Sequence, residues 1–193
     1  MLKIITTTLT FVITLLLSSN AFAASWVLDK DKSAINFVSV KKTNIAESHT
    51  FTDFSSSITE TGQTSVVIQN SSVETAVEIR NDRLRRFLFE TADFPETTIT
   101  TDISKITPLS AGESITTSLP ATLSLHGVSK EIILNVLINQ STNNTMLVAS
   151  TQPIIIKASD YGMDKGLAKL SELMGGISLG QSVPVSFALT FTQ

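Results

Sequence analysis

The chain has 193 residues and carries 14 basic and 17 acidic side chains, a formal net charge of −3. This weakly acidic balance gives no electrostatic indication of nucleic-acid binding, which requires an extended basic surface, and the absence of cysteine excludes disulfide bonds. With only two histidines, His49 and His126, a histidine-rich metal site is excluded as well. A mixed histidine–carboxylate site stays open, but no spacing supports it, and we predict no metal.

Residues 1–23 have the pattern of a secretory signal peptide. Lys3 is followed by an apolar run broken only by threonines through Leu17, and then by a small-residue ending at Ala21–Ala23. The competing interpretation, a membrane anchor, needs roughly 20 predominantly apolar residues, and the uninterrupted apolar stretches here are shorter. We therefore expect cleavage after this ending, which leaves residues 24–193 as one soluble, exported domain with a net charge of −4.

Threonine, serine, valine and isoleucine dominate the remaining chain, and these residues favour strands over helices. Alternating apolar residues indicate strands that keep one face away from water. In chain order we predict strands at Ser33–Lys41, Thr50–Thr59 (with a bulge near Asp53), Ser65–Gln69 and Val73–Arg80, a helix at Asn81–Glu90, strands at Thr97–Ile106, Ser118–His126, Lys130–Asn139 and Met146–Lys157, a helix at Asp164–Met174, and a last strand at Val183–Phe191.

Two of these segments alternate most regularly. Every second residue from Leu119 to Leu125 is apolar, and the turn at Gly127 then predicts a hairpin with the next strand. The last strand alternates equally well, and a terminal strand of this kind needs a partner, which closing a barrel supplies. Pro153 interrupts its strand region and is expected at an edge or a bend.

The two predicted helices are short and amphipathic. In Asn81–Glu90, apolar residues lie at i, i+3 and i+4, with arginines between them. In Asp164–Met174 the apolar spacing is also helical, and Gly175-Gly176 provides a stop. The sequence therefore predicts a mainly β domain, an antiparallel barrel with two short helices.

No catalytic constellation is evident in the sequence. Ser124 and His126 lie on one strand face and can approach each other, but neither lies in a G-x-S-x-G elbow. His126 is better interpreted as a hydrogen-bonded or solvent-facing turn residue. We therefore predict that the protein is not an enzyme.

The one concentration of charge and the aromatic residues each allow two interpretations. The arginines of the first helix either form its solvated face or receive an anionic or polar group at a cavity mouth. The phenylalanines either fill the barrel or line a ligand cavity within it. The arginines are Arg80, Arg83, Arg85 and Arg86, and the phenylalanines are Phe37, Phe51, Phe54, Phe87, Phe89, Phe94 and Phe187.

Five segments, spread in order over the whole mature chain, resemble the YceI family of lipocalin-like periplasmic proteins. The stretch Leu123–Lys130, with its leucine-x-leucine-histidine-glycine-valine sequence, is the most specific of them. The others are Trp26–Asp29 with Ser33–Phe37, Ser72–Thr75 followed by Arg80-Asn81, Leu88–Pro95, and Asp160–Met163.

The resemblance implies an eight-stranded antiparallel lipocalin-like barrel that holds a long apolar lipid, such as a polyisoprenoid, an isoprenoid quinone or a fatty amide, in the periplasm. Apart from that ligand it implies no cofactor. The expected lipid-binding residues are Ile35, Phe37, Phe51, Phe54, Ile58, Leu84, Phe87, Leu88, Ile99, Leu123, Leu125, Val185, Phe187 and Leu189, and the headgroup candidates are Arg80, Arg83 and His126.

The chain departs from the family pattern at three places. Asn81 stands where many members carry aspartate, Ser48-His49-Thr50 lacks the usual glycine, and the segment Asp164–Gly180 is long. The departures bear on the cavity mouth and the ligand more than on the fold.

Three alternatives to a lipid carrier stay open. They are a scavenger of lipophilic toxins, a lipid-modifying enzyme that uses His126 or Tyr161, and a solidly packed barrel that acts through a protein partner such as a membrane enzyme. Homodimerisation through an exposed strand or the short helices stays open as well, but no feature of the sequence demands it.

Overall fold

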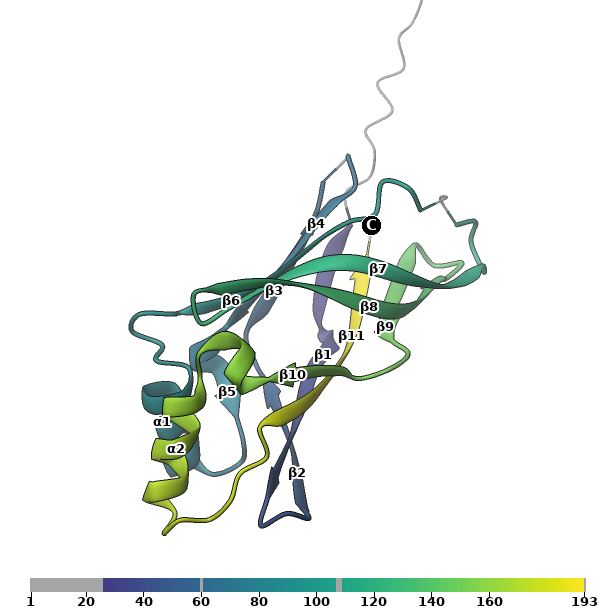
Figure 1. Ribbon diagram of the computed structural model, residues 1–193. Helices are drawn as coiled ribbons and strands as arrows, with labels where there is room; N and C mark the ends of the chain where they lie inside the picture. Colours follow the sequence, from purple (N-terminus) through teal and green to yellow (C-terminus); the bar gives the residue numbers. More distant parts are fainter. Residues whose placement is uncertain (1–25, 60, 107–108, 193) are drawn as a thin grey trace, which may run out of the picture.

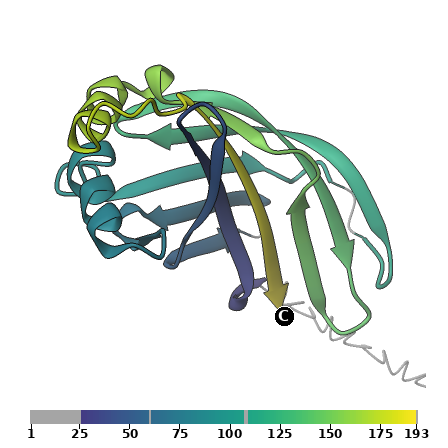
Figure 2. The ribbon, with the colours of Figure 1, turned by 90° about the horizontal axis from the view of Figure 1, so that it is seen from below.

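The computed structural model describes residues 26–59, 61–106 and 109–192, so the predicted signal peptide lies outside the described residues. The chain forms a strongly curved antiparallel sheet with its helices gathered at one end (Figures 1 and 2). The strands are β1 (Val27–Lys41), β2 (Ile45–Phe51), β3 (Phe54–Ile58), β4 (Gln63–Gln69), β5 (Val73–Glu74), β6 (Glu96–Asp102), β7 (Ser114–Leu125), β8 (Val128–Gln140), β9 (Thr145–Ser150), β10 (Ile154–Lys157) and β11 (Ser182–Thr192).

The strands follow the order β3-β4-β6-β7-β8-β9-β11-β1-β2-β5, and β10 pairs with β11 beside this path. The mainly β, antiparallel, barrel-like fold is therefore confirmed, but two details of the expectation were wrong. The described residues contain eleven strands rather than eight, and no continuous ladder closes the sheet. Figure 2 shows how the sheet nevertheless wraps around its interior.

Three interruptions explain the higher strand count. Thr52 and Asp53 separate β2 from β3, where the sequence predicted a bulge, and the short helix η1 (Asn70–Ser72) separates β4 from β5. Pro153 precedes β10 and follows β9; lacking an N–H, it cannot donate to a ladder. With each interrupted pair taken as one run of chain, eight runs remain. The run β2–β3 links both ends of the path, because β2 pairs with β1 and β3 pairs with β4.

The interruption before β10 leaves part of the wall without a ladder. β9 pairs with the second half of β8, from Val136 to Gln140, whereas β10 pairs only with β11. The first half of β8 therefore has β7 as its one paired neighbour among the described strands.

The predicted hairpin is confirmed. β7 and β8 pair over their whole lengths, and Leu125 opposes Val128 across the two-residue loop His126-Gly127. Both loop residues have positive φ, 50° for His126 and 75° for Gly127, as a type I′ turn requires. The predicted partner for the last strand is also present, since β11 pairs with β1, β9 and β10.

The predicted strand Val73–Arg80 was wrong beyond Glu74. After β5 the chain turns into α1 (Glu78–Arg83), which continues as the π-helix η2 (Leu84–Leu88), so the expected helix also begins earlier than predicted. The reason is Asn81, whose buried Oδ1 accepts hydrogen bonds from the Thr75 N–H at 2.9 Å and the Thr75 hydroxyl at 2.6 Å. These bonds fold the chain back at a point where alternation alone favours an extended strand.

The second predicted helix is confirmed as α2 (Asp164–Leu173), preceded by the short helix η3 (Ala158–Tyr161). Helix α2 packs on η2 at Gly166, where a Cβ atom would overlap the carbonyl oxygen of Phe87. Only glycine allows this approach. Within the described part of the chain, each helix is too short or too polar to pass through a bilayer.

Candidate ligand-binding site

Three neighbouring cavities run through the interior, from the open part of the barrel to the helices. We call them the barrel chamber, the central chamber and the helix chamber. The barrel chamber is lined by Ile35, Ser56, Ile58, Thr64, Val66, Ile68, Ile99, Thr101, Ile103, Leu119, Leu134, Val136, Ile138, Met146, Val148, Ile154, Val185, Phe187, Leu189 and Phe191. The central chamber is lined by Ile35, Phe37, Phe51, Ile68, Leu88, Phe89, Thr97, Ile99, Leu123, Leu125, Ile132, Ile154, Ile156, Ala158, Met163, Leu167, Val183 and Val185. The helix chamber is lined by Phe37, Ser39, Val40, Lys41, Glu47, His49, Arg80, Arg83, Leu84, Leu88, Leu167, Leu170, Met174, Leu179, Gly180 and Val183.

The central and barrel chambers share walls and form one apolar space. Five side chains line both of them: Ile35, Ile68, Ile99, Ile154 and Val185. The space open to the centre of a water-sized sphere is about 130 Å³ in the central chamber and about 110 Å³ in the barrel chamber. One water needs only roughly 10–15 Å³ by this measure, so neither space is a mere packing defect.

The few polar side chains in these two chambers are already hydrogen-bonded within the protein. In the central chamber only Thr97 is polar, and its hydroxyl donates to Asn70 Oδ1 at 2.7 Å. In the barrel chamber, the hydroxyls of Ser56, Thr64 and Thr101 donate to backbone carbonyls at 3.1, 3.5 and 2.8 Å. The chambers therefore present almost purely apolar surface to a ligand.

The helix chamber differs because charged and polar groups form one of its sides. Its walls include Lys41, Glu47 and Arg80, and Glu47 pairs with both cations, at 2.7 Å from Lys41 Nζ and 3.0 Å from an Arg80 nitrogen. The hydrogen bond from Lys41 is the main cause that lowers the pKa of Glu47, and the bond from Arg80 adds to it. The carboxylate of Glu47 therefore stays ionised and holds the two cations at the chamber wall.

His49 is the buried member of this polar side. It is 5 % exposed, its Nε2 lies 2.8 Å from the Ser39 hydroxyl on β1, and its ring packs against Phe37 with centroids 5.1 Å apart. Burial lowers the pKa of His49, and the charge of Arg80 lowers it further. The imidazole is therefore neutral at pH 7.

Two buried nitrogens at this chamber have no hydrogen-bond partner among the described residues. They are His49 Nδ1 and Arg80 Nε. The other Arg80 nitrogens are used, one by Glu47 and one by the carbonyl of Thr75 at 2.6 Å. Buried polar atoms are rarely left unpaired, so these two nitrogens are exceptional in the interior.

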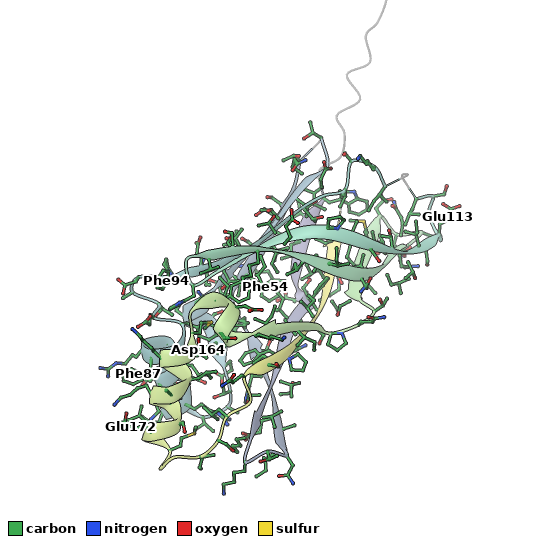
Figure 3. All side chains as sticks on the ribbon, viewed as in Figure 1. Phe54, Phe87, Phe94, Glu113, Asp164 and Glu172 are labelled. Atoms are coloured by element: carbon green, nitrogen blue, oxygen red, sulfur yellow. The ribbon has the colours of Figure 1, made fainter. Side chains whose placement is uncertain are left out.

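Most of the predicted lipid-binding residues lie on the chamber walls. Only Phe54 and Phe87 line none of the three chambers. Phe54 is 4 % exposed and packs in the core, and Phe87 lies among the helices, at the opposite end of the molecule from Glu113 in Figure 3. The twelve that line a chamber are Ile35, Phe37, Phe51, Ile58, Leu84, Leu88, Ile99, Leu123, Leu125, Val185, Phe187 and Leu189.

The headgroup candidates separate in the structure. Arg80 and Arg83 line the helix chamber, but His126 lines none of the three. Its Nε2 lies 2.8 Å from a Glu90 carboxylate oxygen, its Nδ1 lies 3.3 Å from the Tyr161 carbonyl, and its ring packs on Phe94 at 4.2 Å. These contacts hold the turn before β8 against the loop after η2.

Among the described residues, the side chains considered for catalysis are not hydrogen-bonded to one another. The Ser124 hydroxyl pairs with Ser129 at 2.7 Å rather than with His126. Tyr161 is 3 % exposed, and burial raises the pKa of its hydroxyl. In residues 26–59, 61–106 and 109–192, no three side chains of the metal-binding types are close enough together to share an ion.

The predicted lipid-binding residues missed about half of the central chamber, most of the barrel chamber and the buried histidine. Several of the missed wall residues lie two positions from a predicted one and therefore on the same strand face, as Val183 does relative to Val185. The alternation of the sequence could have identified them. His49 lies two residues before Phe51 and therefore on the same strand face. The missed central-chamber residues are Ile68, Phe89, Thr97, Ile132, Ile154, Ile156, Ala158, Met163, Leu167 and Val183.

Comparison with known proteins places the chain among domains of the same architecture. The family described as YceI-like domain matches residues 26–191. A solved structure from Saccharophagus degradans, described as a polyisoprenoid binding domain implicated in plant cell wall breakdown, is 35% identical, with a TM-score of 0.82 over 86% of this chain and 97% of that one. The structure of Burkholderia cenocepacia BcnA is 19% identical, with a TM-score of 0.64 over 84% of this chain and 98% of that one. A search of the curated proteins found no significant match.

Proposed function

The chain belongs to the family of YceI-like domains, and from this we propose that it binds the hydrocarbon chain of a polyisoprenoid lipid in its central and barrel chambers. The observation that carries the proposal is the shared apolar wall of these two chambers, whose few polar side chains are already hydrogen-bonded. The likeness to the polyisoprenoid binding domain of Saccharophagus degradans supports the same ligand class.

The wall composition suits a long, methyl-branched chain. Isoleucine, valine and leucine form most of both chambers, and the chambers are joined end to end by the five shared residues. Burying a methylene group contributes about 0.8 kcal/mol, so one isoprene unit contributes about 3–4 kcal/mol before the ordering costs of binding. A chain of several units therefore has ample driving force without directional contacts.

We further propose that the protein acts as a carrier or store in the periplasm and not as an enzyme. The apolar chambers offer no free acid, base or nucleophile along a bound chain, which supports binding without chemistry. A solidly packed barrel is disfavoured by the size of the two chambers. Export to the periplasm depends on the predicted signal peptide.

Mass spectrometry on the protein purified natively tests the proposal. The full chain is expressed with its N-terminal segment, isolated without detergent, weighed intact and then extracted with solvent. We expect a stoichiometric lipid with a long isoprenoid chain. Protein that is empty on isolation, and that also fails to take up offered polyisoprenoids, would contradict the proposal.

The N-terminal residues of the same sample test the predicted export. Cleavage after Ala23 predicts a mature protein that begins at Ala24 and is released with the periplasmic fraction. A chain that keeps residues 1–23 and stays with the membranes would contradict this part.

A further inference from the structure

We propose that the helix chamber holds the polar end of the bound lipid, and that His49 Nδ1 and Arg80 Nε donate hydrogen bonds to an oxygen of that headgroup. This inference rests on the proposed function and extends it, because it assigns the direction of the ligand and the chemistry of its end. The isoprenoid chain then runs from the helices into the central and barrel chambers.

The continuity of the chambers supports this direction. Phe37, Leu88, Leu167 and Val183 line both the helix chamber and the central chamber, so a chain that leaves the headgroup enters apolar space at once. At the other end, the three hydroxyls of the barrel chamber, on Ser56, Thr64 and Thr101, already donate to backbone carbonyls. The unsatisfied polar atoms are therefore at the helix end alone among the described residues.

The hydrogen-bonding capacity of His49 identifies what it needs. A neutral imidazole carries one N–H, and the Ser39 hydroxyl can donate to Nε2. We infer the tautomer in which Ser39 is the donor and the His49 proton is on Nδ1, which then requires an acceptor. Because His49 is 5 % exposed, bulk water is a poor source of that acceptor.

Arg80 Nε also requires a hydrogen-bond acceptor, and for arginine this requirement does not depend on a tautomer. Nε of an arginine is always a donor, and here the two terminal nitrogens are fixed by Glu47 and by the carbonyl of Thr75. The guanidinium is held on both sides while its Nε stays without a partner among the described residues. Both residues line the helix chamber, and an oxygen of a bound headgroup is the acceptor that we infer for their unpaired nitrogens.

The charges around the chamber favour an electron-rich oxygen. Lys41, Arg80 and Arg83 are cations, Glu47 is the one anion on the wall, and the buried histidine is neutral. The surplus of two positive charges stabilises either the partial charge of a carbonyl oxygen or the full charge of a phosphate. The shared chemistry is an oxygen acceptor, and the two sources are distinguished by experiment.

The test compares three probes with the same prenyl chain length: a polyprene hydrocarbon, a prenylated benzoquinone and a prenyl phosphate. Binding to the delipidated full protein is measured by competition against a fluorescent apolar probe. We expect at least one oxygen-bearing probe to bind about tenfold more tightly than the hydrocarbon. A gain for the quinone identifies a carbonyl, and a gain for the phosphate identifies an anion.

Histidine variants separate a ligand contact from a structural role. In His49→Gln the side-chain amide reaches the Nε2 position and keeps a partner for Ser39, but nothing replaces Nδ1. In His49→Asn the amide lies near Nδ1 and the bond to Ser39 is lost. The headgroup gain is the ratio of oxygen-bearing probe affinity to hydrocarbon affinity measured on the same variant. We expect this ratio to fall to about one in His49→Gln and to persist in part in His49→Asn.

Arginine variants supply the second, independent measurement. Arg80→Lys keeps the charge but removes Nε, and we expect it to reduce the headgroup gain by about fivefold or more. Arg86→Lys is the matched control, because Arg86 lies on the same helical run, is exposed and lines none of the chambers.

The outcomes also separate this inference from the proposed function. Equal binding of all three probes, or a headgroup gain that survives both His49→Gln and Arg80→Lys, would overturn the headgroup assignment and leave the proposed function standing. Failure of all three probes, the hydrocarbon included, would overturn the proposed function itself.

Discussion

Arg80 on α1 and Glu47 on β2, 33 positions apart in the chain, are joined by an ion pair of 3.0 Å at the wall of the helix chamber. Lys41 binds the same carboxylate at 2.7 Å. The helix and the sheet are thus tied together at the place where the interior changes from apolar to polar. Both side chains are about one quarter to one third exposed, so the pair fixes geometry more than it adds stability.

Filling the central chamber should block lipid uptake. Leu123 lines this chamber and is 4 % exposed, so Leu123→Trp occupies the space that the chain needs. Ile133→Trp is the control, because Ile133 on the neighbouring strand is 56 % exposed. We expect at least a tenfold loss of polyisoprenoid binding for Leu123→Trp and none for Ile133→Trp. Equal binding by both folded variants would place the ligand elsewhere.

The network around Asn81 should dominate the stability of the helix end. Asn81→Ala leaves the buried Thr75 N–H without an acceptor and removes a bond to Glu74, which should lower the free energy of unfolding by about 2–4 kcal/mol. Urea unfolding measures the change. Asn143→Ala, in the exposed turn between β8 and β9, should change it by less than about 0.5 kcal/mol. A similar, small effect of both would show that this network is dispensable.

Gly166 should be intolerant of alanine. A methyl group there would overlap the Phe87 carbonyl, so Gly166→Ala must push α2 away from η2 and should cost about 1–3 kcal/mol. The exposed neighbour Lys165 provides the control as Lys165→Ala. Thermal unfolding compares the two variants, and a stabilised Gly166→Ala would contradict the observed helix contact.

Stability should fall between neutral and mildly acidic pH because of His49. Its pKa in the folded protein lies below the ordinary value of 6.5, mainly because of burial. The unfolded chain therefore binds a proton first as pH falls below 6.5, and the folded state loses stability until pH reaches the lower, folded pKa. Urea unfolding from pH 8 to pH 5 should show this loss in the native chain and a smaller one in His49→Gln. An equal loss of unfolding free energy in the native chain and in His49→Gln would refute the role of His49.

His126 should be dispensable for ligand binding. It lines no chamber and contacts Glu90, Phe94 and the Tyr161 carbonyl instead. We expect His126→Ala to retain the lipid found in the native protein, with a modest loss of stability. Loss of lipid from a folded His126→Ala would restore this residue as a headgroup candidate, and a lipid modified by the native protein alone would favour an enzyme.

Elements with a strict period were predictable from the sequence, and elements set by single side chains were not. The second half of β7 and the whole of β11 alternate without a break, and α2 has regular helical spacing. The end of β7 and both bounds of β11 and α2 were therefore predicted to within one residue, whereas β7 begins four residues earlier than predicted. The helix at Glu78–Arg83 was read partly as a strand, because the residue that folds the chain back there, Asn81, acts through hydrogen bonds and not through hydropathy. The breaks at Asp53 and Pro153 were indicated, but their effect on the strand count was not.

The candidate site was predictable in its apolar part and only partly in its polar part. Inward-facing positions of a strand follow from alternation, which gave residues such as Ile35 and Leu123. Which polar side chains meet at the mouth depends on how α1 lies against β1 and β2, and no local pattern encodes that. The charge of Arg80 identified it as a headgroup candidate. The role of His49 depends on its contacts with Ser39 and Phe37, which the sequence alone does not show.

The break at Pro153 leaves one line of the barrel wall without backbone hydrogen bonds between neighbouring strands. Between β10 and the first half of β8, side chains such as Ile132 and Ile156 form the wall without a backbone ladder between the strands. Widening the central chamber along this line separates side chains that are in van der Waals contact but breaks no ladder hydrogen bonds. The same side chains can then form van der Waals contacts with a thicker ligand. We therefore expect the proposed lipid site to tolerate differences in the thickness of a bound chain more readily than differences in its polar end.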